Sequence, residues 1–298
     1  MPRALASTMS AWSETVAAAY VEACRAELEV VKPGNVHCYA EGHGMTAADF
    51  VRSADASAAA IAARGRRVGA RVRGAVEATL AAVGQNTNLG IILLCAPLAA
   101  ASEGKGCLRR ALARVLQNLD ECDAADVFVA IALANPGGLG RAARHDVHEP
   151  ARVTLREAMD EAADRDRVAR QYVTVYQDIF DVGLPALALA RLASRTPGAG
   201  TLAVYLAFLA AFPDTHLARK FGAEAAERVR LEAAPWRDAC ASGDGLSGMT
   251  EKLLAWDASL KSRGLNPGTS ADLTVATLFA ASLAAARGDA LLFHPKDD

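Results

Sequence analysis

Apolar residues recur along most of the chain at the three-to-four residue spacing of an amphipathic helix. No β-branched run alternates between polar and apolar positions with a hairpin turn at its end, so strands are not indicated. We therefore predict an all-α fold, a single multi-helix bundle-like domain of roughly ten to twelve helices spanning residues 1–298. Three of the stripes are Leu108, Leu112, Val115, Leu116 and Leu119; Val168, Tyr172, Val175 and Ile179; and Leu273, Ala276, Ala280 and Leu283.

Composition supports packed helices and argues against a nucleic-acid partner. Hydrophobic residues make up 52% of the chain and aromatics only 5%, and the long Ala and Leu stretches are punctuated by Arg and Glu, which favour helix. The formal net charge is −2 and the pI about 6.3, which provides no excess positive field for polyanions. The local basic run Arg64–Arg73 could grip phosphates, but a solvated helix face or a bend explains it better.

The cysteine pattern and the apolar runs indicate a cytoplasmic protein. Six cysteines are scattered without a Cys-x-x-Cys pair, which favours reduced thiols over a zinc site or disulfides, and Cys95 is expected in the core. The longest apolar run, Leu89–Ala101, is shorter than the roughly 20 residues that cross a bilayer. The amino terminus has no compact apolar signal core. We expect no membrane partner, and a homodimer remains open.

The least regular stretch, residues 135–150, is rich in Gly and His and has no helical stripe, which predicts a long irregular loop. Such a loop is often functional, as a domain boundary or an active-site flap, but a mobile surface excursion is equally consistent. His145 and His148 are therefore assigned no role. Shorter breaks at 196–198 and 242–245 are expected to be plain turns.

Four helix junctions carry more polar groups than capping requires. The first, Lys32–His37, follows a helix that contains Glu27. Pro33 should stop that helix, and Gly34 would allow the backbone to approach a ligand closely. Lys32, Asn35 and His37 beside such a turn suit an anion, although an ordinary helix stop with a surface lysine fits equally well.

The second junction, Gln85–Gly90, places four amide or hydroxyl side chains before an apolar run. Asn86 or Thr87 can cap the following helix. The surplus donors, among them Asn88, and the helix amino terminus could then hold phosphate or a sugar hydroxyl.

The third junction, Phe212–Lys220, has Asp214 as a natural N-cap, with Thr215 beside it and two basic residues, Arg219 and Lys220, about a turn further on. An acid, a hydroxyl and paired bases thus converge there.

The fourth junction, Asn266–Asp272, begins the last long helix. It offers two possible hydroxyl caps, Thr269 and Ser270, and a carboxylate expected in the first turn. Taken alone, capping explains Asp272.

Together the junctions resemble a nucleotide triphosphate site. Carboxylates with oxygen ligands suit magnesium, which proteins hold through one or two carboxylates and substrate phosphates. No standard phosphate loop or dinucleotide fingerprint is present. The expected metal ligands are Glu27, Asp214 and Asp272, and the expected substrate-binding residues are Lys32, Asn35, Asn86, Thr87, Asn88, Thr215, Arg219, Lys220, Asn266 and Thr269.

The sequence resembles the triphosphoribosyl-dephospho-CoA synthase family through KPGNVH, QNTNLG, PDTHLARK and NPGTSADLT, one motif at each junction and in this order. The resemblance implies an all-helical, magnesium-dependent enzyme in which dephospho-CoA attacks the ribose of ATP and adenine leaves. Glu27, Lys32, Asn86, Thr87, Asp214 and Asp272 stand at matching positions.

One region departs from the family pattern. Members that serve acyl-carrier systems have a Gly-Ala-Arg-Gly-Glu stretch where this chain has residues 167–185. The chain looks closer to a subgroup found with tetrahydromethanopterin-type one-carbon carriers, which contain the same kind of ribosyl phosphate linkage. The acceptor is therefore either dephospho-CoA or a pterin-carrier precursor.

Breaking the bond between adenine and ribose develops positive charge on the sugar, which Asp214 or Asp272 could stabilise. His37 is a candidate acid for the departing adenine. Lys32, Arg219, Lys220 and magnesium would hold the triphosphate. The rival hypotheses are a magnesium-dependent phosphate-ester hydrolase and a non-catalytic helical nucleotide-binding protein.

Overall fold

The computed structural model describes residues 9–142, 144–194, 196–241 and 249–289. These residues form fourteen α-helices and one π-helix and contain no β-strand, which confirms the all-α prediction. The number of helices exceeds the predicted range because turns divide several stretches into short helices. The elements are α1 (Ala11–Leu28), α2 (Ala47–Ile61), α3 (Val68–Val83), α4 (Leu89–Ser102), α5 (Leu108–Gln117), α6 (Glu121–Ala134), α7 (Leu155–Ala162), α8 (Arg167–Thr174), η1 (Ile179–Gly183), α9 (Leu184–Ala193), α10 (Ala199–Ala211), α11 (Thr215–Phe221), α12 (Ala223–Ala241), α13 (Met249–Ser262) and α14 (Gly268–Ala286).

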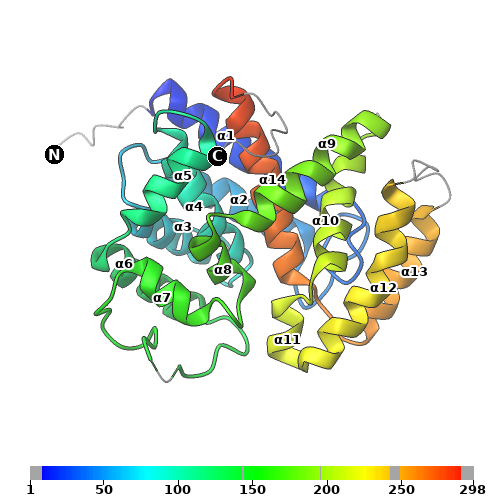
Figure 1. Cartoon of the computed structure of the whole chain (residues 1–298). Coiled ribbons are helices and arrows are strands. Elements are labelled where there is room, and N and C mark those ends of the chain that lie inside the picture. The colour runs from blue at the N-terminus through cyan, green and yellow to red at the C-terminus, as the bar shows by residue number, and fades with distance from the viewer. Residues whose placement is uncertain (1–8, 143, 195, 242–248, 290–298) are drawn as a thin grey trace.

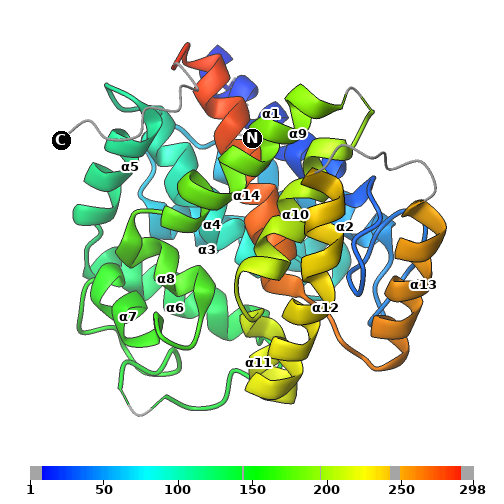
Figure 2. The ribbon, with the colours of Figure 1, turned by 45° about the vertical axis from the view of Figure 1, so that its right-hand side comes forward.

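Helix α14 lies at the centre of the molecule. In Figures 1 and 2 it runs between α3–α8 on one side and α10–α13 on the other. Its side chains enter both hydrophobic clusters, the larger through residues such as Leu273 and Phe279 and the smaller through Ala271. Residues at the start of α14 are therefore well placed to meet segments from both sides.

By length and composition, α14 could also cross a membrane, and 78% of that stretch is buried inside the fold. Two bent pairs, α8 with residues 179–193 and α10 with α11, pass the same test only if each pair is counted as one span. Asp272 and several hydroxyl residues interrupt the apolar run of α14, so residues 89–101 are the longer uninterrupted apolar run.

A proline inside α4 explains one set of tertiary contacts. Pro97 has no N–H, so the carbonyl of Leu93 loses its helical partner. The hydroxyl of Tyr172 donates to that oxygen at 2.6 Å, and the hydroxyl of Tyr176 donates to Leu94 O at 2.9 Å. Residues 168–179 therefore do not form the single predicted helix. The chain turns through left-handed conformations at Val175 and Tyr176, with φ of 53° and 57°, before η1 begins.

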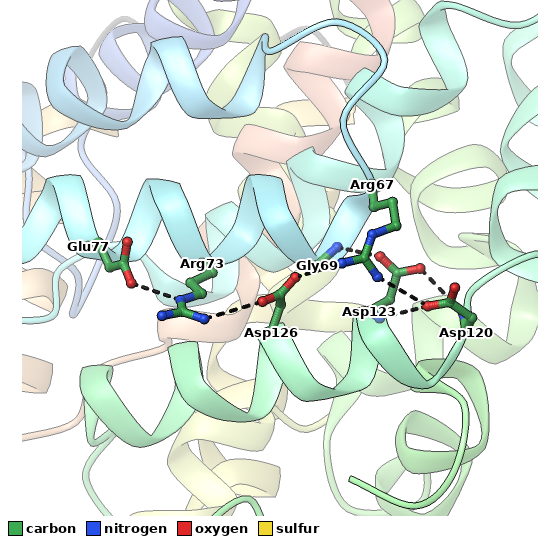
Figure 3. Close-up of polar contacts among 7 residues, drawn as sticks. All are labelled: Arg67, Gly69, Arg73, Glu77, Asp120, Asp123 and Asp126. Atoms are coloured by element: carbon green, nitrogen blue, oxygen red, sulfur yellow. Dashed lines mark hydrogen bonds and ion pairs between the residues drawn. The ribbon is translucent and has the colours of Figure 1, made fainter. Parts of the chain in front are cut away.

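The basic run at the start of α3 joins two helices. Figure 3 shows Arg67 and Arg73 reaching from α3 to Asp120 and Asp126 at α6, with nitrogen-to-oxygen distances of 3.3 to 3.5 Å. Arg71 is buried and donates to the backbone oxygen of residue 61 at 2.7 Å. Arg67, Arg71 and Arg73 thus have carboxylate or carbonyl partners, and the buried Arg71 does not lie on the solvated face that was expected.

The loop at residues 135–150 is irregular, as predicted, and it contacts α11. Gly137 O accepts a hydrogen bond from Arg219 Nε at 3.2 Å, and a Cβ at Gly138 would lie 3.2 Å from the Arg219 side chain. His145 and His148 lie on this loop. The break at 196–198 leads into α10 through Gly198 in the left-handed region, while the predicted turn at 242–245 lies outside the described residues.

Candidate functional site

The four predicted junctions meet at the beginning of α14. Asn35 Nδ2 donates to Asn266 Oδ1 at 2.7 Å, which joins the first junction to the fourth. The hydroxyls of Thr215 and Thr269 lie 3.0 Å apart and join the third to the fourth. The second junction meets α14 at Gly90, which is discussed with Asp272 below. Segments separated by more than 200 residues thus share one location.

The first junction contains a buried ion pair. Lys32 Nζ pairs with the Glu27 carboxylate and donates to Asn35 Oδ1 at 2.9 Å. Lys32 is fully buried and Glu27 nearly so. Burial raises the pKa of Glu27 and lowers the pKa of Lys32, while their mutual attraction opposes both shifts. Lys32 is therefore not the surface lysine of the ordinary helix-stop interpretation.

The turn after Lys32 is fixed from outside the motif. Gly34 has a φ of 83°, and a Cβ there would lie 2.7 Å from Leu265 O, so a glycine is required. Gly34 N donates to Asp257 Oδ1 at 2.8 Å, and Tyr205 Oη donates to Pro33 O at 2.7 Å. Asp257 and Tyr205 belong to α13 and α10, where helical periodicity alone gives no signal for such a role.

His37 is buried against the same carboxylate. Its Nε2 lies 3.3 Å from Asp257 Oδ2, and Lys261 Nζ donates to that oxygen at 2.9 Å. Burial lowers the pKa of His37, although Asp257 opposes the shift. His37 Nδ1 is buried and has no hydrogen-bond partner in the described part of the chain. A neutral imidazole is a better proton acceptor than donor, which argues against the predicted role of His37 as an acid.

The second junction caps α4 and binds α2. Asn86 Oδ1 accepts from Leu89 N at 3.2 Å, as the capping prediction required. Thr87 Oγ1 lies 2.6 Å from Ser53 Oγ, and the buried Asn88 donates to a second α2 serine at 3.5 Å. Thr87 and Asn88 therefore bind serines on α2, and neither serine was among the predicted site residues.

Asp214 is the N-cap of α11, and it also caps α14. Its Oδ1 accepts from His216 N at 2.9 Å and from Leu217 N at 3.1 Å, while its Oδ2 accepts from the N and Oγ of Ser270, both at 2.8 Å. Helix α14 has no side-chain cap of its own. The prediction that Thr269 or Ser270 caps α14 is therefore wrong, because the Asp214 carboxylate supplies that interaction from another helix.

Asp272 differs from Asp214 in both its position and its contacts. It is the fifth residue of α14, beyond the first turn in which it was expected, and it does not cap the helix. Its side chain is partly exposed, and no hydrogen bond to its carboxylate occurs within the described ranges. A Cβ at Gly90 would lie 2.0 Å from Asp272 Oδ2, so only glycine admits the carboxylate there.

The electrostatic environment of Asp272 disfavours its negative charge. Although part of the residue remains accessible, the removal of its carboxylate from bulk water raises its pKa well above the usual value, and the charges of Glu27, Asp214 and Asp166 add to this shift, while Arg219 opposes it. An ionisable group in such a position, without an internal partner, is a candidate for binding a cationic ligand or for chemistry.

The basic residues of the third junction lie at its outer side. Arg219 Nη1 is 3.4 Å from Asp166 Oδ2, and Lys220 is exposed beside Gly137 of the long loop. Asp166 was not predicted. Its Oδ1 accepts from Val168 N at 2.8 Å as the cap of α8, so its sequence signal is only that of a helix start.

The three predicted metal ligands do not form a ready-made metal centre. Within the part of the chain that the structure describes, no group of three or more His, Cys, Asp or Glu side chains is arranged to hold an ion. Glu27 is paired with Lys32, and Asp214 accepts four hydrogen bonds. Of the three, only Asp272 has both carboxylate oxygens without a hydrogen-bond partner in the described part of the chain, while in Glu27 only Oε1 is paired.

Comparison with known proteins decides the family. The model of the ATP:dephospho-CoA triphosphoribosyl transferase family matches residues 13–290. The chain belongs to this family. The triphosphoribosyl transferase assignment confirms the resemblance drawn from the four motifs and makes the chain an enzyme of the transferase class.

A solved structure supports the triphosphoribosyl transferase assignment. The chain is similar to a crystal structure from Archaeoglobus fulgidus that is provisionally assigned as a triphosphoribosyl-dephospho-CoA synthase, with 27% sequence identity and a TM-score of 0.62. The similarity covers 77% of this chain and 96% of that one. A search of curated proteins gave no match.

Proposed function

We propose that the chain transfers the triphosphoribosyl group of ATP to the hydroxyl of dephospho-CoA, with release of adenine. The bond between ribose C1′ and adenine N9 breaks and its electron pair leaves with adenine. A new bond forms between C1′ and the acceptor oxygen, the hydroxyl loses its proton, and adenine gains one. The positions of the four family motifs, which meet at the start of α14, support this assignment.

The free carboxylate of Asp272 carries the proposal. Positive charge develops at C1′ as the bond to adenine breaks, and a nearby carboxylate stabilises it. Asp214 can serve less well, because all of its hydrogen bonds would have to be given up first. We therefore assign the transition-state carboxylate to Asp272 and a structural role to Asp214.

The hydrogen bonds and pKa shifts of the candidate side chains indicate which group takes up each proton. His37 is held by Asp257 with its Nδ1 free, and burial lowers its pKa. It would accept the proton of the acceptor hydroxyl. Solvent would supply the proton to adenine, since Asp272 is assigned to the reaction as the negatively charged carboxylate.

The reaction is proposed to require magnesium. When bound, the ion would neutralise charge on the triphosphate. Asp272 and the ATP phosphates would hold it, in keeping with the few protein ligands that magnesium commonly takes. Arg219 and Lys220 lie at the outer side of the third junction, where they would contact the phosphates.

A product assay tests this function. The purified protein is incubated with ATP, magnesium and dephospho-CoA, and every product is identified by mass. The expected result is one free adenine for each acceptor molecule that gains a triphosphoribosyl group. Phosphate release without adenine would indicate a hydrolase instead, and unchanged ATP would indicate a binding protein.

The departure of residues 167–185 from the family pattern keeps a second acceptor in view, a precursor of a tetrahydromethanopterin-type carrier. In the structure this segment forms α8, η1 and the start of α9, and Arg167 N donates to Thr215 Oγ1 at 3.2 Å. The divergent segment thus contacts the third junction directly. Adenine release with the pterin precursor but not with dephospho-CoA would establish the second acceptor.

A further inference from the structure

His216 follows Asp214 in the third junction, and its ring is fixed on several sides. Its backbone N donates to Asp214 Oδ1 at 2.9 Å and to Thr269 Oγ1 at 3.1 Å. The imidazole lies against Gly268, where a Cβ would come within 3.2 Å of Nδ1. The ring therefore sits between the third and fourth junctions, at the contact on which the proposed site depends.

The hydrogen bond from Arg219 determines which ring nitrogen carries the proton. Arg219 Nη2 lies 3.4 Å from His216 Nδ1. A guanidinium has donors only, so Nδ1 must accept. A neutral imidazole with Nδ1 as acceptor carries its hydrogen on Nε2. A protonated ring would carry a hydrogen on Nδ1 facing the Arg219 guanidinium, so this contact requires the neutral imidazole.

The resulting Nε2–H donor is left without an acceptor. His216 Nε2 is buried and makes no hydrogen bond in the portion of the chain that the structure describes. Buried donors in native proteins nearly always have partners. Arg219 lies 3.4 Å from this ring and Lys220 follows it on α11, so basic side chains stand beside the ring. An acceptor that completes the site should therefore be anionic.

We propose that His216 Nε2–H donates to a phosphate oxygen of the triphosphate in ATP. This inference rests on the proposed function and adds a neutral donor to the cations that hold the donor substrate. Because the bond forms with the bound triphosphate rather than with the reacting carbon, it should contribute to affinity for ATP more than to the rate of transfer.

Two substitutions separate the donor from the rest of the side chain. His216→Gln can place an amide N–H near the position of Nε2, whereas His216→Asn can reach only near Nδ1. Binding of ATP, inorganic triphosphate and adenosine to the full-length protein is measured by calorimetry. We expect His216→Asn to weaken ATP and triphosphate binding by about tenfold to a hundredfold. His216→Gln should retain affinity within about threefold, and adenosine should bind all three proteins alike. In turnover, His216→Asn should raise KM for ATP and change kcat little.

The outcomes distinguish this inference from the proposed function. If the unsubstituted protein binds neither ATP nor triphosphate, the proposed function fails. If it binds both and His216→Asn binds them equally well, the role of His216 is overturned. A second measurement needs no variant: the Nε2–H resonance of His216 is recorded by NMR in the unsubstituted, 15N-histidine-labelled protein. Triphosphate should shift that resonance, and no shift at saturation would overturn the proposal.

Discussion

The carboxylate of Asp214, at the start of α11, accepts both the backbone N–H and the hydroxyl of Ser270 in α14 at 2.8 Å. One side chain therefore caps two helices whose sequences are more than fifty residues apart. This arrangement fixes the start of α14 and with it the position of Asp272. Asp214 thus has a structural role although it lies in a family motif, and Asp272 is the better candidate for chemistry.

Substitution of Asp214 tests the structural explanation. Asp214→Asn replaces one acceptor oxygen by an NH2 group that faces donors, so we expect the free energy of unfolding to fall by about 2–4 kcal/mol. Ser270→Ala removes only one of the hydrogen bonds and should cost about 1 kcal/mol. Urea unfolding of both variants measures these losses. Native stability in Asp214→Asn together with lost turnover would return Asp214 to the catalytic candidates.

The Glu27–Lys32 pair should behave as a unit. Removing one partner leaves an uncompensated buried charge, so Glu27→Gln and Lys32→Met should each destabilise the fold by about 3–5 kcal/mol. The double variant should lose clearly less than the sum of the two, because neither charge remains. A double-mutant cycle from denaturant unfolding measures the coupling. Additive losses would show that the two groups do not stabilise each other.

Gly90 provides a test of the geometry at Asp272. Gly90→Ala would place a methyl group 2.0 Å from the present position of Asp272 Oδ2, so the carboxylate must move. We expect turnover to fall at least tenfold, because displacement of a positioned group by about 1 Å is costly. Gly74→Ala on α3 is the matched control, since its nearest neighbour is the Ala60 methyl at 3.3 Å. Equal turnover in the two variants would show that Asp272 need not occupy this position.

Asp272 should also make stability depend on pH. Its folded pKa is raised above the usual value of 3.8, so the folded protein holds a proton that the unfolded chain has lost. The stability linked to this proton is present below the unfolded pKa and is lost as the pH rises through the folded pKa. Asp272→Asn removes this dependence. Relative to that of the unsubstituted protein, its urea midpoint should become more favourable as the pH rises above the usual carboxyl pKa of 3.8. A difference that is constant over this range would contradict the shift.

Local patterns predicted the helices and the residues at their ends. Periodicity located most helices, Asn86 accepts from the first N–H of α4, and Asp214 caps α11 as its position indicated. Periodicity could not detect the break at Val175, because that turn depends on contacts between Tyr172, Tyr176 and the backbone of α4. A stripe of suitable spacing does not by itself show that the helix is continuous.

The site was harder to predict because its partners are distant in sequence. Asp257 binds the turn at Gly34 from 223 residues away, and Asp166 carries no signal beyond that of a helix cap. Asp214 and Asp272 were predicted to have similar roles, since both are acids near helix starts. Only the tertiary contacts separate them, because one carboxylate has four donors around it and the other has none in the described structure.

The most direct test of the account is turnover and melting measured together on Asp272→Asn. The substitution keeps the shape of the side chain and removes its charge, and Asp272 caps no helix in the structure. We expect adenine release from ATP in the presence of acceptor to fall by roughly two to four orders of magnitude, with a melting temperature at or slightly above that of the unsubstituted protein. Near-native adenine release at saturating ATP, magnesium and acceptor would show that Asp272 is not the carboxylate of the reaction.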